Sequence, residues 1–182
     1  MMRSVEVDLS KERMKFSAGH FTVFSPSERE NLHGHNFTVG AVFTTAVPEE
    51  GLACDYAVLK KHVQAICDRL DEKVLIATKS PHIAIAHEGG QVRIRFAGEE
   101  MILPARDVEE LPISNVTIEE LSMLFLGELM ESLPRELRPL IESVSVRISS
   151  GAGQGATSKW ERASQLPRPE GRSLEVRAEE LG

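Results

Sequence analysis

Apolar and polar residues alternate along two segments in the first quarter of the chain. Within residues 14–20 the side chains at every second position are apolar, and this parity ends at His20. Residues 33–47 repeat the alternation. A period of two is typical of a strand with one buried face. Ser25-Pro26-Ser27 favours a turn between the two segments, so we predict an antiparallel pair with His20 on the apolar face.

Apolar residues spaced by three and four positions predict two helices. The first follows Asp55, a residue type favoured at helix N-termini, and extends to about Leu70. The second follows a capping box formed by Thr117 and Glu120 and ends near Leu133. Each helix is predicted to bury one face.

Further strands are predicted before and after the second helix. Residues 89–104 contain two alternating runs joined by Ala97-Gly98, which predicts a β-hairpin inserted within residues 77–112. Residues 144–148 and 156–162 predict two late strands. The order of elements indicates an α+β fold.

The composition fits one domain over residues 1–164. The chain has 182 residues, of which 41% are hydrophobic, enough to bury a core without disulfides. Residues 165–182 carry prolines and charges with few apolar residues, so we expect a flexible tail there.

Charge and cysteine content exclude several classes of partner. The net charge is −7, and the basic residues are scattered singly, so nucleic acid is not expected as a partner. Cys54 and Cys67 are the only cysteines, have no metal-binding spacing and are expected to lie in the core. No apolar segment is long enough for a bilayer, and no signal segment is evident, so a cytoplasmic location without a membrane partner is expected.

Three histidines form the candidate chemical site. His33 and His35 are two residues apart, so on a strand both imidazoles point to one side, about 7 Å apart along the backbone. The predicted pairing brings His20 alongside. Three neutral imidazoles with a fourth position open is the coordination of catalytic zinc. A His-x-His pair on its own is more often a chance occurrence than a metal site, and adding His20 makes the two explanations about equally good.

Two segments around these histidines resemble signature blocks of the 6-pyruvoyl-tetrahydropterin synthase and 6-carboxytetrahydropterin synthase family. They are Phe-Ser-Ala-Gly-His at 16–20 and Leu-His-Gly-His-Asn-Phe at 32–37. The resemblance continues at Asp55-Tyr56, at Leu70-Asp71 and at Asn-Val-Thr-Ile-Glu over 115–119, and spans about residues 14–160.

The resemblance implies both a fold and an activity. The fold is the tunnelling fold (T-fold), a four-stranded antiparallel sheet with two helices on one face. It assembles into homo-oligomers, commonly hexamers built from trimers, with active sites between subunits. The implied metal is Zn²⁺ held by His20, His33 and His35, and the implied substrate is a pterin, 7,8-dihydroneopterin triphosphate. The reactions remodel or cleave its side chain at C6.

The chain departs from the family at the proton acceptor. Many members carry a cysteine four residues before the first histidine of the His-Gly-His block, and an Asp-His pair at the end of the first helix. Here those cysteine and histidine positions are Arg29 and Glu72, while Asp71 is kept. Glu30 resembles a family variant in which a glutamate replaces the cysteine and the product is 6-hydroxymethyl-7,8-dihydropterin. Glu30 and Asp71 are therefore the candidate catalytic residues. As alternatives, Glu30 is a solvated loop charge and Asp71 lies near a helix end without acting in catalysis.

The pterin-binding residues also differ from the family. Thr117 matches a family threonine or serine that lines the substrate pocket, although a helix cap is the stronger explanation for this residue. Family members usually grip the pterin with a glutamate on the late strand, and the matching residues 147–150, Arg-Ile-Ser-Ser, contain no carboxylate.

Three functions are consistent with these residues. The leading one is zinc-dependent cleavage of the dihydropterin side chain. The first alternative is a 6-pyruvoyl- or 6-carboxy-tetrahydropterin synthase, and the second, from another class, is a non-catalytic zinc-containing binding protein on the same fold.

Overall fold

The computed structural model describes residues 3–49 and 51–162, and the predicted flexible tail at 165–182 lies outside them. The described part contains the helices α1 (Tyr56–Leu70) and α2 (Ile118–Ser132). Two short 3-10 helices span Ala105–Asp107 and Arg138–Leu140. No helix in the described part is long and apolar enough to cross a membrane.

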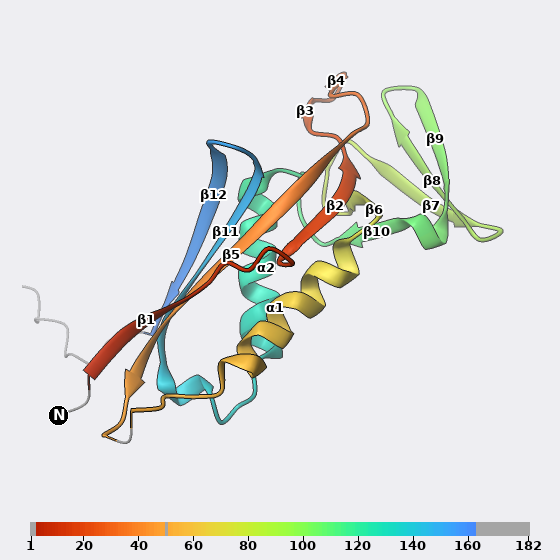
Figure 1. Cartoon of the computed structure of the whole chain (residues 1–182). Coiled ribbons are helices and arrows are strands. Elements are labelled where there is room, and N and C mark those ends of the chain that lie inside the picture. The colour runs from red at the N-terminus through yellow and green to blue at the C-terminus, as the bar shows by residue number, and fades with distance from the viewer. Residues whose placement is uncertain (1–2, 50, 163–182) are drawn as a thin grey trace, which may run out of the picture.

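One large sheet carries most of the fold (Figure 1). Its seven strands are β1 (Arg3–Leu9), β2 (Lys15–His20), β5 (His33–Val47), β6 (Lys73–Ala77), β10 (Val108–Leu111), β11 (Ile141–Gly151) and β12 (Gln154–Glu161). The strands β2, β5, β11 and β12 are consecutive antiparallel neighbours, and these are the strands that the hydrophobic pattern predicts.

The predicted number of strands is wrong, because three more strands extend the sheet beyond the four predicted. The strand β1 pairs with β5, while β6 pairs in parallel with β2 and with β10. The sheet is therefore mixed rather than wholly antiparallel. The strands β6 and β10 have five and four residues, too few for a clear alternation.

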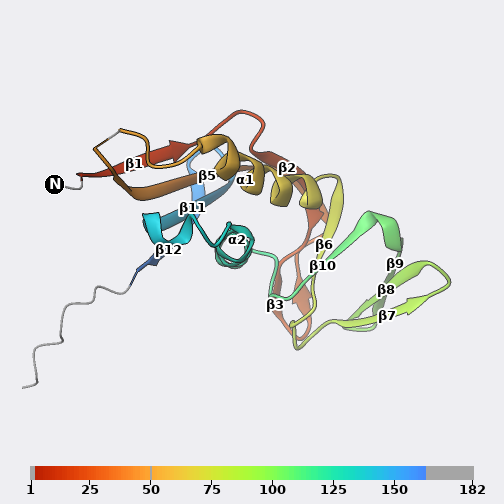
Figure 2. The same ribbon diagram turned by 90° about the horizontal axis from the view of Figure 1, so that it is seen from below.

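Both helices pack against the same face of this sheet. The side chains at alternate positions of β2, β5 and β11 share a single core with the apolar faces of α1 and α2, including Phe16, Phe37, Phe43, Val146, Leu59, Val63, Leu121 and Phe125. The two helices also contact each other, and Figure 2 shows α2 nearly end-on next to α1. The predicted helix starts are confirmed, because Asp55 and Thr117 each accept a hydrogen bond from the first helical turn.

The insertion between β6 and β10 forms a second, smaller sheet. Its strands are β7 (Ala84–Glu88), β8 (Gln91–Phe96) and β9 (Glu99–Pro104), so the predicted hairpin is present and gains a third strand. The pattern missed β7 because four of its five residues are exposed. A short ribbon of β3 (Val23–Ser25) and β4 (Glu28–Arg29) precedes β5. Phe21 and Val23 pack against β8 in a core separate from the main one.

Candidate metal centre

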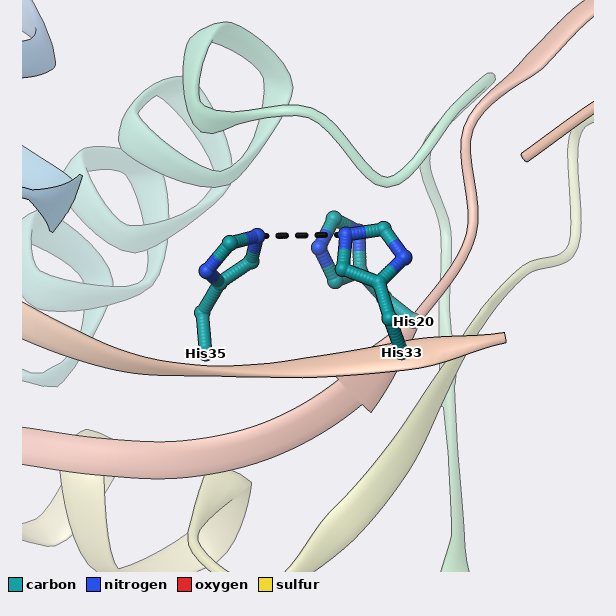
Figure 3. Close-up of side chains that lie close together, drawn as sticks. All are labelled: His20, His33 and His35. Atoms are coloured by element: carbon teal, nitrogen blue, oxygen red, sulfur yellow. Dashed lines mark hydrogen bonds between the residues drawn. The ribbon is translucent and has the colours of Figure 1, made fainter. Parts of the chain in front are cut away.

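The pairing of β2 with β5 brings the three histidines together. His20 is the direct partner of His33, and Ala18 is the partner of His35, so all three imidazoles project from one face at the end of the pair. One ring nitrogen from each lies within 4.8 Å of the others (Figure 3). The cluster therefore follows from strand parity, as predicted.

Backbone carbonyls orient two of the imidazoles. The Nδ1 of His20 lies 2.9 Å from the oxygen of Val116, and the Nδ1 of His33 lies 2.8 Å from the oxygen of Asn31. A carbonyl oxygen can only accept, so these contacts put the proton on Nδ1 and leave the Nε2 lone pair free. This is the tautomer that ligates a metal through Nε2.

The ring nitrogens of the three histidines converge on one position that a cation could occupy. The Nε2 of His20 is buried and has no hydrogen-bond partner among the described residues. The Nε2 atoms of His33 and His35 lie 3.1 Å apart, so a shared proton or a cation must lie between them (Figure 3). An unpartnered buried nitrogen beside two converging ones is the donor set of a three-histidine metal site.

The electrostatics of His20 favour the form that binds metal. Burial lowers the pKa of His20 below its ordinary value of 6.5, and the nearby His33 and His35 lower it further, against the opposing effect of the hydrogen bond to Val116. His20 is therefore neutral near pH 7, as a ligating imidazole must be.

A hollow of about 210 Å³ opens beside the three imidazoles. It is lined by the histidines together with Thr22, Glu30, Phe37, Thr117, Ile118, Glu119, Ser150 and Gln154. Two of the sequence-predicted residues, Glu30 and Thr117, are thus brought to the metal centre. Larger hollows occur elsewhere, among them one of about 480 Å³ beside Lys60, but within the described chain only the three histidines form a group suited to a metal ion.

Glu30 is fixed in the hollow by reciprocal bonds to Thr22. The Thr22 amide donates to Glu30 Oε2 at 3.0 Å, and the Glu30 amide donates to the Thr22 oxygen at 2.8 Å. Burial acts to raise the pKa of Glu30, but hydrogen bonding from Thr22 and the charges of His33 and His20 outweigh it and bring the pKa below its ordinary value of 4.5. Glu30 is therefore an ionised carboxylate near neutral pH.

Thr117 has both of the roles considered from the sequence. Its hydroxyl accepts from the Glu120 amide at 3.3 Å as the N-cap of α2, and the residue also lines the hollow. Sequence reasoning missed Glu119 and Gln154 as lining residues. The signal for Glu119 was available, because it closes the matched block at 115–119.

Asp71 is not brought to the histidines within this chain. Its Oδ1 accepts from the Ser17 amide at 2.6 Å, and its own amide caps α1 by donating to Cys67. The amide of Glu72 donates back to the Ser17 oxygen at 2.8 Å. Asp71 thus joins the end of α1 to β2 and does not line the hollow. A catalytic role for Asp71 stays a prediction.

Fold and site together define an α+β protein with a three-histidine cluster able to hold a metal ion beside a carboxylate-containing hollow. The family model described as 6-pyruvoyl tetrahydropterin synthase matches residues 8–159. The chain therefore belongs to this family of pterin-processing enzymes, as the two histidine-containing blocks predicted.

Individual relatives agree with this assignment. A Methanocaldococcus jannaschii protein, provisionally named a 6-carboxy-5,6,7,8-tetrahydropterin synthase, is 29% identical over 144 residues, which cover 79% of this chain and 88% of the relative. The 6-pyruvoyl tetrahydropterin synthase of Plasmodium falciparum has a TM-score of 0.82 at 26% identity, covering 87% of this chain and 99% of that one.

The Plasmodium vivax enzyme of the same name has a TM-score of 0.83 at 24% identity, covering 88% of this chain and 99% of that one. Two solved variants of it replace a glutamate, described as its catalytic residue, by alanine or by cysteine. At this level of identity the likeness to the P. vivax enzyme shows the fold.

Proposed function

We propose that the protein is a zinc-dependent enzyme that cleaves the C6 side chain of 7,8-dihydroneopterin triphosphate and releases 6-hydroxymethyl-7,8-dihydropterin. One observation carries the proposal: the Glu30 carboxylate and the three imidazoles line a single hollow. A metal site and a proton acceptor in one cavity are the two parts that side-chain cleavage beside a polarised oxygen requires.

Zinc is the metal that the donor set favours. Three neutral imidazoles with one open position is the pattern of catalytic zinc sites, and the cluster offers no fourth protein ligand among the described residues. When bound, zinc supplies a positive charge that polarises a substrate oxygen and makes neighbouring carbon-bound or hydroxyl protons more acidic.

Glu30 takes the substrate proton. Its Oε2 is held by the Thr22 amide, while its Oε1 makes no hydrogen bond with the described residues and is free to accept. The lowered pKa of Glu30 keeps the carboxylate ionised but makes it a weak base. Glu30 therefore depends on the acidified substrate to drive proton transfer. The P. vivax enzyme, in which a glutamate is described as the catalytic residue, supports this role on the same fold.

Glu119 replaces the missing pterin-gripping carboxylate. A pterin presents adjacent N–H donors, which pair best with a bidentate acceptor. Apart from Glu30, Glu119 is the carboxylate among the residues that line the hollow, and it lies in the first turn of α2. Thr117, also in the lining, contributes a further substrate contact.

A 6-pyruvoyl- or 6-carboxy-tetrahydropterin synthase is the less favoured reading. In many family members the proton acceptor is a cysteine at the position of Arg29, and here the Arg29 guanidinium pairs with Glu99 instead of lining the hollow. We also propose that the chain is one domain over residues 1–164 and assembles as a trimer-based hexamer. In that assembly Asp71 would act in the hollow of a second copy.

Turnover of 7,8-dihydroneopterin triphosphate by purified zinc-loaded protein tests the proposal. We expect 6-hydroxymethyl-7,8-dihydropterin as the product, a loss of kcat of about 10²–10⁴-fold in Glu30→Ala, and near wild-type rates in Glu28→Ala, an exposed glutamate of the same loop. Full turnover by Glu30→Ala would remove Glu30 from the mechanism. Zinc retention with no pterin turnover by the wild type would favour the non-catalytic binding protein.

A further inference from the structure

We infer that Arg29 is a positioning residue that ties the Glu30 loop to the inserted sheet, so that β8 and β9 brace the proton acceptor. The role of Glu30 as proton acceptor rests on the proposed function, whereas the contacts of Arg29 do not depend on it. The role of the inserted sheet would then be to hold the Glu30 loop in place.

The Arg29 guanidinium is held between two aromatic rings. Its Cζ lies 5.3 Å from the ring centre of Phe21 and 5.9 Å from that of Phe96, and its side chain is 16% exposed. A guanidinium removed from water in this way is attracted to both ring faces. Phe21 precedes the β3–β4 ribbon, whereas Phe96 ends β8, so the cation joins two elements that are far apart in sequence.

Each end of the guanidinium fork is also hydrogen-bonded to a different element. One terminal nitrogen of Arg29 lies 2.5 Å from the Glu99 carboxylate at the start of β9. The other donates to the backbone oxygen of Glu30 at 2.8 Å. Only a planar fork reaches both acceptors at once, so lysine cannot reproduce the pair of contacts.

These contacts complete the restraint on the Glu30 peptide. Its amide donates to Thr22, its carboxylate accepts from Thr22, and its carbonyl accepts from Arg29. Beneath them Val92, Ile94 and Phe96 of β8 pack against Phe21 and Val23. The Glu30 loop is therefore attached to the inserted sheet by an apolar core and by the ion pair between Arg29 and Glu99.

Stability alone does not account for an arginine here. The Nε of Arg29 is buried with no partner among the described residues, an unfavourable state that an aliphatic side chain in the same space would avoid. Glu99 is 64% exposed, so its ion pair with Arg29 is a weak source of stability. What arginine adds is the directed bond to the Glu30 carbonyl.

Three variants and one matched control test the brace. Arg29→Met keeps the unbranched stem and removes the fork, and Glu99→Gln removes the anchoring charge at an exposed site. Glu100→Gln is the control, because Glu100 lies next to Glu99 but pairs with Arg93 and Arg95. Arg29→Lys asks whether charge without the fork is enough.

The first readout is hydrogen exchange at the Glu30 and Thr22 amides of the zinc-loaded protein. We expect exchange about tenfold faster in Arg29→Met than in wild type, a smaller increase in Glu99→Gln, and none in Glu100→Gln, with unchanged zinc content. The second is the kinetic split with 7,8-dihydroneopterin triphosphate. We expect kcat to fall about 10- to 100-fold in Arg29→Met and in Arg29→Lys, with KM little changed, because a small misplacement of a catalytic group acts on the chemical step.

The two readouts separate the brace from the proposed function. A wild-type protein that does not turn over this substrate would refute the proposed function, and the exchange data would still decide the brace. Amide exchange and kcat in Arg29→Met that match those of Glu100→Gln would overturn the brace and leave the proposed function standing. Wild-type kcat in Arg29→Lys would overturn the requirement for the fork.

Discussion

The carbonyl oxygen of Val116 lies 2.9 Å from the Nδ1 of His20, which links a candidate metal ligand on β2 to the segment that starts α2. Val116 immediately precedes Thr117, the N-cap of that helix. The orientation of His20 is thus coupled to the way α2 begins. The coupling gives Thr117 an influence on the metal centre that does not require contact with a ligand.

Replacing Thr117 by alanine should destabilise the protein by about 1 kcal/mol, because the Glu120 amide loses its side-chain acceptor. Zinc affinity should also fall, since the Val116 carbonyl becomes less well fixed. Urea unfolding and a competitive zinc chelator measure the two effects. Thr117→Ser retains the acceptor and should behave as wild type, so equal losses in Ser and Ala variants would exclude the cap as the cause.

The stability of the metal-free protein should fall as the pH is lowered below about 6.5. The folded state holds His20 neutral with a lowered pKa, whereas the unfolded chain takes up a proton near the ordinary value. The contribution of neutral His20 to stability is therefore fully present above the pKa that His20 has in the unfolded chain. It is lost as the pH falls toward the lower pKa that His20 has in the folded state. Chemical unfolding at several pH values between 7.5 and 5.5 measures the slope. His20→Gln should flatten this slope, and an unchanged slope would show that other groups cause it.

The two substitutions Asp71→Asn and Asp71→Ala should separate the structural and catalytic roles of Asp71. Asparagine still accepts from the Ser17 amide, so Asp71→Asn should keep wild-type stability, while alanine should cost about 1 kcal/mol. If Asp71 orients a proton carrier in a neighbouring copy, kcat falls in both variants. Full activity in Asp71→Asn would leave Asp71 with the structural role alone.

Cys67 should resist alkylation in the folded protein. Burial raises the pKa of the Cys67 thiol to about 12, so almost no thiolate is present at pH 8. Cys54 is only partly buried, and its raised pKa slows its reaction without blocking access. Mass spectrometry after iodoacetamide treatment should find label on Cys54 first and on Cys67 only after unfolding. Rapid native labelling of Cys67 would mean that the α1 core opens readily.

The sequence predicted the histidine cluster because one rule, strand parity, fixes it. His33 and His35 share parity, and the antiparallel pairing of β2 with β5 places His20 opposite His33. Helix caps were predictable for a similar reason, since Asp55 and Thr117 accept hydrogen bonds from amides only two and three residues further along the chain. The two-residue period of a strand and the hydrogen bonding of nearby residues were enough to predict these features.

Features that depend on long-range packing were not predictable. The environment of Arg29 is set by Phe96 and Glu99, some seventy residues away, and no periodicity connects those positions. The lining residue Gln154 enters the hollow through the placement of β12, and the short strand β6 is a strand because β2 offers it an edge. Each of these outcomes requires the assembled sheet.

Zinc content, measured by elemental analysis of the purified protein, tests the metal centre most directly. Wild-type protein should hold about one zinc ion per chain. His33→Ala should lose it, and His82→Ala, which removes an exposed histidine of the insertion, should keep it. Equal zinc in the wild type and in His33→Ala would contradict the three-histidine site and the catalysis proposed on it.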